Sequence, residues 1–301
     1  MMLGQTPQGF RLSVLKKAYE LFTQNPVKVT DDCGLVVKYG LGRVGVVCGD
    51  RFNMKVTYPE DLYYADKVFQ VKSQSLTNVS SDHLADLADR VIVVFGGNRG
   101  IGRRISEMAK GFGARAYVFS RRNGCDVSNV KSVQKVLREI YQDEGRINYV
   151  VNTAALLRMG TLDSRSYESI AAEMTTNYYG TIVVAKESFR YLAETKGSLL
   201  LFTSSSYTRG RAFYCVYSST KAAVVNVAQA LAEEWAPFGC SVNVINPERT
   251  NTEMRRENFG LENPSTLLDP DQVAKLSLLV LLSDFTGQVI DVRRNLSGNS
   301  L

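Results

Sequence analysis

The chain has 301 residues, of which 45% are hydrophobic and 22% are charged, and its formal net charge is +6 at pH 7. This composition supplies enough apolar material for a substantial core and excludes an intrinsically disordered chain. The length exceeds that of an average single domain, so we expect two units or one large unit with an extension.

The positive net charge favours an anionic ligand, such as a nucleotide or a sugar phosphate. The basic residues are scattered, without the aromatic-interleaved stripe or zinc-finger spacing that is typical of nucleic-acid binders. The first residues lack a basic region followed by an apolar one, and no apolar run reaches membrane-spanning length. We therefore predict a protein that binds neither nucleic acid nor a membrane.

The five cysteines are Cys33, Cys48, Cys125, Cys215 and Cys240. Their number is odd, their spacing is wide and none belongs to a CxxC pair, which disfavours a disulfide framework and a thiolate metal site. The sequence therefore predicts a protein of the reducing cytoplasm without a bound metal.

A polar segment divides the chain. Residues 72–81 lack apolar periodicity, and we place a linker at 72–87 between an N-terminal segment, 1–71, and a larger domain, 88–301. A short helix at 83–89 is expected to lead into the larger domain.

From residue 91 onward, apolar strands alternate with helical patterns. Strands are expected at 91–95, 116–120, 147–152, 199–203 and 241–245. Helices are expected near 101–111, 129–142, 166–194 and 214–235. This alternation predicts an α/β fold with a doubly wound parallel sheet of the Rossmann type.

A glycine-rich turn follows the first of these strands. Gly96, Gly100 and Gly102 form a G-x-x-x-G-x-G pattern between a buried strand and a helix. Glycines here permit a tight turn and let the backbone approach a pyrophosphate, which meets the free N–H groups at the helix N-terminus. The expected contacts to a dinucleotide in this loop are Gly96, Asn98, Arg99, Gly100, Ile101 and Gly102.

The end of the second strand, Ser120-Arg121-Arg122, predicts which dinucleotide binds. A carboxylate at this place would hold the ribose 2′-hydroxyl of NAD and repel a 2′-phosphate. Two guanidiniums stand here instead, and Arg99 adds a third, so charge-assisted bonds to a 2′-phosphate are expected. The sequence predicts NADPH/NADP as cofactor; ordinary surface arginines are the alternative interpretation.

Tyr217 and Lys221 lie four residues apart in a stretch compatible with a helix, so their side chains share one face. Free tyrosine has a pKa of about 10, and a nearby ammonium that favours the phenolate is expected to lower the pKa of Tyr217. The pair is suited to general acid catalysis on a carbonyl compound. Such a pair also occurs by chance in many helices, so its meaning depends on the surrounding motifs.

Those motifs resemble the short-chain dehydrogenase/reductase family across almost the whole larger domain. In order, they are the glycine loop, Asp126-Val127, Asn152-Thr153-Ala154-Ala155, Asn177, a serine-rich strand end and the Tyr217/Lys221 pair. The resemblance implies that Ser204, thirteen residues before Tyr217, hydrogen-bonds the substrate carbonyl, with Ser205 as the alternative. It further implies that Tyr217 donates its proton and Lys221 also holds the nicotinamide ribose. Asn177 would position a water for proton relay, or else cap or kink its helix.

The same resemblance implies a set of cofactor contacts beyond the glycine loop. They are Ser120, Arg121, Asp126, Val127, Asn152, Ala154, Tyr217, Lys221, Pro247 and Thr252. Two departures from the family stand out: Glu248 replaces the usual glycine after Pro247, and the passage 121–126 is too short for the usual crossover helix and strand. We therefore expect either a rudimentary third strand or an altered sheet edge.

Residues 1 to about 70 resemble the C-terminal part of a methylerythritol-phosphate or sugar-nucleotide cytidylyltransferase. The resemblance rests on residues 5–10, 30–32 and 49–62. It implies that Thr6, Thr30 and Lys55 match residues that help bind phosphorylated substrate. The CTP loop of that family has no counterpart, so we expect an incomplete domain without cytidylyl transfer, either truncated or starting too far downstream.

The pairing of these two parts resembles the bifunctional CDP-ribitol pyrophosphorylase/ribulose-5-phosphate reductases of bacterial capsule synthesis. It implies reduction of D-ribulose 5-phosphate to D-ribitol 5-phosphate with NADPH. The resemblance to the short-chain family implies a homo-oligomer, a dimer or tetramer, assembled through the long helices that carry Asn177 and Tyr217. The candidate phosphate-binding residues are Arg158, Arg209, Arg211, Arg255 and Arg256, with solvated surface charge as the alternative for each. The alternative functions are an NADPH-linked reductase of another carbonyl compound and a non-catalytic cofactor-binding remnant.

Overall fold

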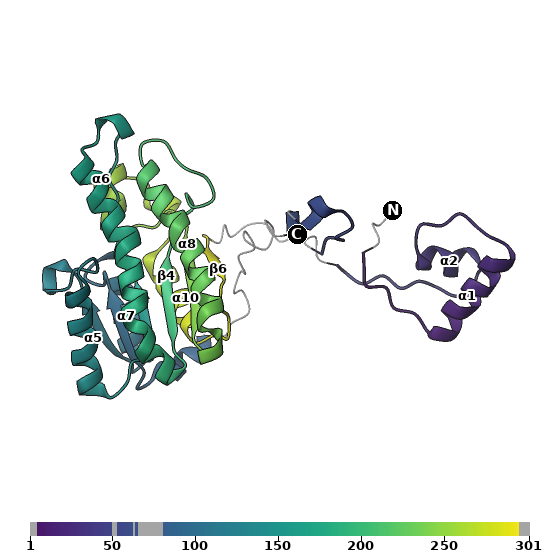
Figure 1. The fold of residues 1–301 in the computed structure, drawn as a ribbon, viewed down its shortest axis with the longest axis horizontal. Helices are drawn as coiled ribbons and strands as arrows, with labels where there is room; N and C mark the ends of the chain where they lie inside the picture. The colour runs from purple at the N-terminus through teal and green to yellow at the C-terminus, as the bar shows by residue number, and fades with distance from the viewer. Residues whose placement is uncertain (1–4, 50–52, 63, 66–80, 295–301) are drawn as a thin grey trace. The chain divides into compact units, whose positions relative to one another are not determined.

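The computed structural model describes residues 5–49, 53–62, 64–65 and 81–294. The chain splits into two compact units, Met1–Val71 and Lys72–Leu301 (Figure 1). Part of the expected linker and the last residues of the expected larger domain lie outside the described residues. Within those ranges, no helix is long and apolar enough to cross a membrane, and no cluster of side chains is suited to hold a metal ion.

The described part of the smaller unit includes the helices α1 (Leu12–Gln24) and α2 (Asp32–Lys38). Asp31 is the N-cap of α2, and its carboxylate accepts a hydrogen bond of 2.9 Å from the backbone N–H of Gly34. The buried core residues are Ala18, Leu35 and Val36. The residues that match phosphate-binding positions of cytidylyltransferases are all exposed: Thr6, Thr30 and Lys55.

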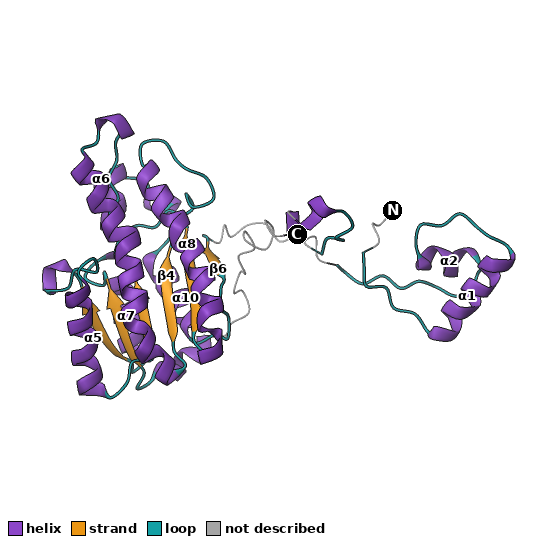
Figure 2. Ribbon diagram, in the orientation of Figure 1, coloured by secondary structure: helices purple, strands orange, loops and turns teal. Residues whose placement is uncertain are grey.

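The larger unit is built on a six-stranded parallel sheet with the order β2-β1-β3-β4-β5-β6 (Figure 2). The strands are β1 (Val91–Phe95), β2 (Arg115–Phe119), β3 (Tyr149–Asn152), β4 (Ser198–Phe202), β5 (Ser241–Pro247) and β6 (Val289–Val292). The strand order reverses between β1 and β3, and the crevice at such a switch point is where doubly wound folds bind nucleotides. The doubly wound parallel sheet expected from the sequence is confirmed.

Helices cover both faces of this sheet. On one face pack α5 (Val130–Glu144), α7 (Gly180–Thr195) and α8 (Cys215–Trp235) (Figure 1). On the other pack α4 (Gly100–Gly111), α10 (Pro270–Leu281) and the 3-10 helix η1 (Ser81–Leu87). Strand β1 is fully buried along its length, which explains its unbroken run of apolar residues.

Two elements differ from the sequence-based expectation. The single helix expected at 166–194 consists of α6 (Tyr167–Met174), the π-helix η4 (Thr175–Tyr179) and α7. The lead-in helix is the 3-10 helix η1. The elements after β5, among them α9 (Glu253–Phe259), α10 and β6, were not predicted.

The short passage after β2 forms the 3-10 helix η2 (Arg121–Asn123). Ser120 and Asn123 cap each other's backbone there, and Gly124 turns the chain with φ +92°. Within the described residues, β2 pairs with β1 alone and is the edge of the sheet. Of the two alternatives for this passage, the altered sheet edge is therefore the one that the structure adopts.

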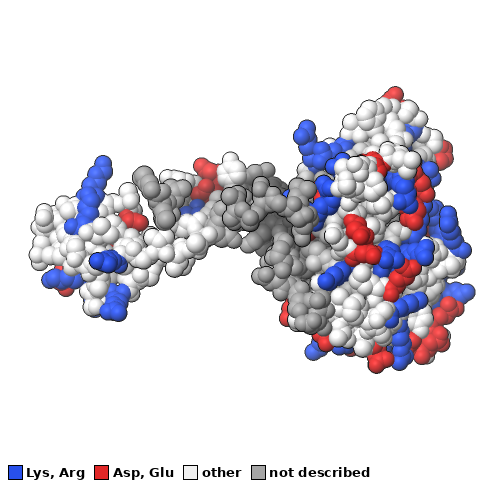
Figure 3. Space-filling view, turned by 180° about the vertical axis from the view of Figure 1, so that it is seen from behind, with Lys and Arg blue, Asp and Glu red and all other residues white. Residues whose placement is uncertain are grey.

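Charges of both signs lie on the surface of the larger unit. On the face drawn in Figure 3, Lys and Arg side chains are interspersed with Asp and Glu side chains. Exposed ion pairs also occur in the larger unit, such as Lys135 with Glu139 at 3.8 Å. Ion pairs of this kind contribute little to stability.

Candidate active site

Two cavities meet at Tyr217. The first, here called the glycine-loop cavity, has a volume of about 320 Å³ and lies at the carboxyl ends of β1 and β2. The second, the serine-loop cavity, has a volume of about 580 Å³ and is lined by residues after β4 and β5. Both are lined by Ile101, Thr203, Tyr217, Pro247, Thr252 and Met254. Tyr217 therefore separates a cavity built on a glycine loop from one built on a serine-rich loop.

The glycine-loop cavity brings together every predicted cofactor contact except Asn152. Asn152 is buried, and its amide donates to Thr181 Oγ1 at 3.3 Å and accepts from the backbone N–H of Ala154 at 3.2 Å. It shapes the chain after β3 and does not line the cavity. The side chain of Asn152 faces the protein interior, and its direct contact with the cofactor stays a prediction.

Two glycines of the loop leave no room for a side chain. Gly96 has φ +79°, and a Cβ there would lie 2.5 Å from the backbone nitrogen of Ala154. A Cβ on Gly102 would lie 2.4 Å from Thr153 Oγ1. Helix α4 begins at Gly100 without a side-chain cap, so no side chain covers the N–H groups of its first turn. This is a cradle that fits a pyrophosphate.

At the end of β2 the cavity is lined by Ser120, Arg121 and Arg122. Ser120 Oγ accepts a hydrogen bond of 2.6 Å from the amide of Asn98. Arg121 and Arg122 are exposed, whereas Arg99 pairs with Glu257 of α9 at 2.6 Å. Of the three guanidiniums expected to meet a 2′-phosphate, Arg121 and Arg122 line the cavity without a carboxylate partner among the described residues, whereas Arg99 has one.

Helix α8 carries Tyr217 and Lys221 on one face. The Lys221 ammonium is buried, donates to the backbone carbonyl of Phe202 at 2.8 Å and lies 5.5 Å from the centroid of the Tyr217 ring. Burial lowers the pKa of Lys221 to about 8. The carbonyl of Lys221 in turn accepts from Thr203 Oγ1 at 2.8 Å, which ties α8 to the end of β4.

The pKa of Tyr217 differs from the sequence-based expectation. Burial raises it above its ordinary value, Glu173 and Tyr214 raise it further, and a hydrogen bond with Ser204 lowers it. Lys221 is not among the groups that shift the pKa of Tyr217, and its ammonium donates to the carbonyl of Phe202. The phenol therefore keeps its proton at neutral pH.

Ser204 and Ser205 both line the serine-loop cavity, and Ser204 is the one whose hydroxyl lowers the pKa of Tyr217. The Ser204 hydroxyl also accepts from the Ser206 hydroxyl at 3.3 Å. Ser204 and Tyr217 thus bring two hydroxyl groups to the same cavity, and hydroxyl groups can donate hydrogen bonds to a carbonyl oxygen.

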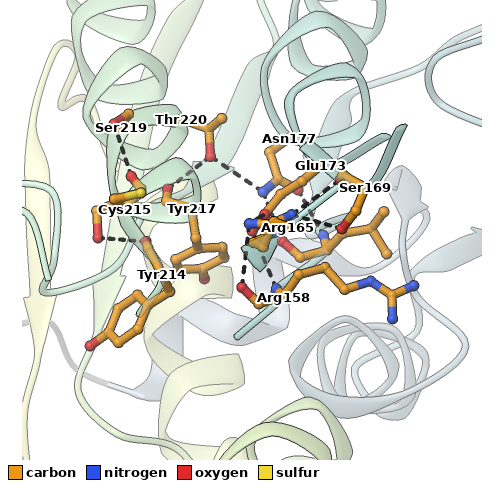
Figure 4. A network of polar contacts seen from close by, with 12 residues as sticks. Arg158, Arg165, Ser169, Glu173, Asn177, Tyr214, Cys215, Tyr217, Ser219 and Thr220 are labelled. Carbon is orange, nitrogen blue, oxygen red and sulfur yellow. Dashed lines mark hydrogen bonds and ion pairs between the residues drawn. The ribbon is translucent and has the colours of Figure 1, made fainter. Parts of the chain in front are cut away.

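Asn177 lies in the π-helix η4 and is buried. Its amide accepts from the backbone N–H of Leu156 at 2.7 Å, and donates to the Leu156 carbonyl at 2.8 Å and to Thr220 Oγ1 at 3.3 Å (Figure 4). Asn177 thus fixes the loop after β3 against α8. Its placement in a π-helix agrees with the alternative of a residue that shapes its helix; the water relay stays a prediction.

A buried ion pair beside Asn177 was not predicted. Arg165 Nη1 lies 2.6 Å from Glu173 Oε2, and the two side chains are 6% and 0% exposed (Figure 4). Glu173 also accepts from the backbone N–H of Arg158 at 3.4 Å. Burial raises the pKa of Glu173, and Arg165 opposes this. Arg165 precedes α6 and Glu173 lies near its end, so no helical spacing in the sequence signals this pair.

The five candidate phosphate-binding arginines do not all line the same cavity. Arg211 and Arg255 line the serine-loop cavity. Arg158 points away from Tyr217 (Figure 4), and Arg256 donates to Asn251 at 2.8 Å. Arg209 is exposed and lines neither cavity.

Comparisons with known proteins agree with this fold and site. A family model described as enoyl-(acyl carrier protein) reductase matches residues 72–289. A model described as 2-C-methyl-D-erythritol 4-phosphate cytidylyltransferase matches residues 1–71. The first match covers well over half of the chain, and the chain belongs to the short-chain dehydrogenase/reductase family, a family of oxidoreductases.

Among individual proteins, the chain is similar to the bifunctional ribulose 5-phosphate reductase/CDP-ribitol pyrophosphorylase Bcs1 of Haemophilus influenzae. The two are 52% identical over 292 residues, which are 96% of this chain and 62% of that protein. This chain thus spans less than two thirds of the length of that relative. It is also 29% identical to carbonyl reductase family member 4 of Danio rerio over 228 residues, 67% of this chain and 95% of that protein.

Solved structures share the fold of the larger unit. A short chain dehydrogenase from Shigella flexneri, complexed with NADP, superposes with a TM-score of 0.63 and 25% identity over 69% of this chain and 98% of that chain. A small-chain dehydrogenase in complex with NADPH gives a TM-score of 0.59 and 25% identity over 68% of this chain and 96% of that chain.

Proposed function

We propose that this protein uses NADPH to reduce the ketone of a sugar phosphate, and that its substrate is D-ribulose 5-phosphate. The product is then D-ribitol 5-phosphate. The observation that carries the proposal is the place of Tyr217, whose phenol lies where a glycine-loop cavity meets a second cavity lined by arginines. The 52% identity with a protein named as a ribulose 5-phosphate reductase supports the choice of substrate.

The glycine-loop cavity fits NADPH in its shape and charge. Gly96 and Gly102 leave the backbone open to a pyrophosphate, and Arg121 with Arg122 offers guanidiniums where a carboxylate would select NAD. The solved relatives at 25% identity are named as complexes with NADP and NADPH, which supports the same cofactor. When bound, this cofactor supplies a hydride to the carbonyl carbon.

The residues around Tyr217 carry the proton transfer. The hydroxyls of Ser204 and Tyr217 hold the carbonyl oxygen between them, and burial keeps the phenol protonated until it donates. Proton donation leaves a phenolate on Tyr217, and Lys221 lies on the same helix face with its ammonium 5.5 Å from the centroid of that ring. Asn177 keeps the loop after β3 in place against α8 during this step.

The test is an assay of NADPH oxidation by the purified chain. D-ribulose 5-phosphate is compared with D-ribulose, with other phosphorylated ketoses and with short ketones, and NADH is compared with NADPH. We expect D-ribulose 5-phosphate and NADPH to give the highest kcat/KM. Turnover of another ketone at higher kcat/KM would favour the alternative of a different carbonyl substrate.

The alternative from a different class is a protein that binds the cofactor without catalysis. It predicts NADPH binding by fluorescence titration with no turnover of any carbonyl compound. The intact set of Ser204, Tyr217 and Lys221 around one junction favours the enzyme. Assembly as a homo-oligomer is a further prediction, checked by light scattering of the purified chain.

A further inference from the structure

The serine-loop cavity is lined by four arginines: Arg211, Arg249, Arg255 and Arg293. Three of them have carboxylate partners. Arg255 forms two bonds with Glu262, at 2.6 and 3.0 Å, and Arg249 lies 4.0 Å from the same carboxylate. Arg293 pairs with Asp291 at 2.7 Å. These three guanidiniums are engaged within the protein.

Arg211 is the exception among them. Its guanidinium forms no hydrogen bond, ion pair or ring contact with any residue in the part of the chain that the structure describes. The acidic residues that line the same cavity, Glu248 and Asp291, are paired with Arg294 and Arg293. Arg211 therefore brings an uncompensated positive charge to the cavity that also contains Ser204 and Tyr217.

The backbone around Arg211 is fixed. Its N–H donates to Ser218 Oγ at 3.3 Å, and Ser218 follows Tyr217 on α8. Two residues later, Phe213 adopts φ +69°, and its carbonyl accepts from the N–H of Gly160 at 2.8 Å. A left-handed conformation is costly for phenylalanine and persists only where the surroundings impose it, as at ligand sites. The loop thus holds Arg211 next to the helix turn that carries Tyr217.

We propose that Arg211 binds the phosphate of the sugar substrate and so selects phosphorylated ketoses. This inference rests on the proposed function, because it assigns the phosphate-binding group of that same site. A guanidinium binds phosphate through paired, charge-assisted hydrogen bonds, which fix orientation as well as position. With its phosphate on Arg211, an open-chain ketose extends along the serine-loop cavity and places its carbonyl at Ser204 and Tyr217.

The other candidates fit this role less well. Arg255 would have to leave Glu262, and its guanidinium also lies 4.1 Å above the Phe259 ring. Arg158 points away from Tyr217 (Figure 4), and Arg256 is bonded to Asn251. Arg211 does not line the glycine-loop cavity, which separates its role from binding of the 2′-phosphate of the cofactor.

The test compares Arg211→Met with Arg209→Met in the full chain. Arg209 is a matched control, because it is an exposed arginine of the same loop that lines neither cavity. With NADPH saturating, we expect Arg211→Met to raise KM for D-ribulose 5-phosphate on the order of 100-fold, and Arg211→Lys about tenfold. Arg209→Met is expected to change KM by less than about threefold, within the range of a neutral surface change.

Two further readouts separate phosphate binding from a structural role. Turnover of unphosphorylated D-ribulose and the Kd for NADPH are expected to be the same in Arg211→Met as in the wild type. Inorganic phosphate is expected to compete with D-ribulose 5-phosphate in the wild type and not in the variant. An equal loss of activity on D-ribulose and its 5-phosphate would overturn the inference.

The inference and the proposed function fail in different ways. If the wild type reduces D-ribulose 5-phosphate and Arg211→Met does so with unchanged KM, the function stands and the role of Arg211 is wrong. If the wild type reduces no sugar phosphate, the proposed function is wrong. In that case, calorimetry measures the binding of inorganic phosphate to the NADPH-loaded wild type and to the NADPH-loaded variant. Equal binding by the two proteins would show that Arg211 does not bind phosphate.

Discussion

The two cavities that meet at Tyr217 are built in different ways. The glycine-loop cavity is shaped by backbone, since Gly96 and Gly102 lie so close to residues after β3 that no side chain fits. The serine-loop cavity carries several charged side chains, and most of them have a partner of opposite charge, either in the cavity or beside it. A backbone-built cavity depends on a few glycines at fixed places. In a cavity lined by charged side chains, the ligand that can bind depends on which of those charges have no partner within the protein.

The largest expected effect is at the junction itself. Tyr217→Phe removes the phenol proton without changing the ring, and we expect kcat to fall about 10²- to 10⁴-fold, the usual contribution of a general acid. The Kd for NADPH should stay unchanged, because only the hydroxyl is lost. Tyr141→Phe is the control, since the Tyr141 hydroxyl bonds Glu194 on the surface. A variant that kept wild-type kcat would exclude Tyr217 as the acid.

The next effect concerns the buried ion pair of Arg165 and Glu173. Glu173→Gln leaves the Arg165 guanidinium buried without its counter-charge, and we expect the free energy of unfolding to fall by about 3–5 kcal/mol. Glu139→Gln removes an exposed pair with Lys135 and should change it by less than about 0.5 kcal/mol. Urea denaturation measures both, and similar losses in the two variants would contradict this ranking.

On the cofactor side, Gly96→Ala combines an unfavourable backbone angle with a contact of 2.5 Å to the backbone of Ala154. We expect the affinity for NADPH to fall on the order of 100-fold, because the loop must shift away from the pyrophosphate. Gly145→Ala is the matched control, with a φ of +70° and no atom within 4 Å. It should lower stability by about 1 kcal/mol and leave NADPH affinity intact. Equal NADPH affinity in both variants would refute the steric explanation.

The smallest effect is a dependence of stability on pH. Burial lowers the pKa of Lys221 to about 8, whereas an unfolded chain keeps a lysine pKa of about 10.4. Between these values the unfolded chain binds a proton that the folded protein has released, so the free energy of unfolding rises with pH. Relative to Lys221→Met, the wild type should gain on the order of 1–2 kcal/mol from about pH 8 to pH 10. Parallel pH profiles of the two proteins would show that Lys221 stays charged.

The parts of the site that the sequence predicted are those that depend on residues close together in the chain. The glycine loop and the Tyr217/Lys221 pair follow from local spacing, because each lies within a few residues on a single element. Contacts between distant residues leave no such pattern: Arg99 pairs with Glu257, and Asn177 bonds the backbone of Leu156. The direction of the Tyr217 pKa was missed for the same reason, since it depends on burial and on Glu173.

Asn177 also links parts of the site that belong to different elements. Its amide bonds both backbone groups of Leu156 on one side and Thr220 on the other, and Thr220 lies next to Lys221 in sequence. One buried amide therefore joins the loop after β3 to the helix that carries Tyr217 and Lys221, so the position of each depends on the other.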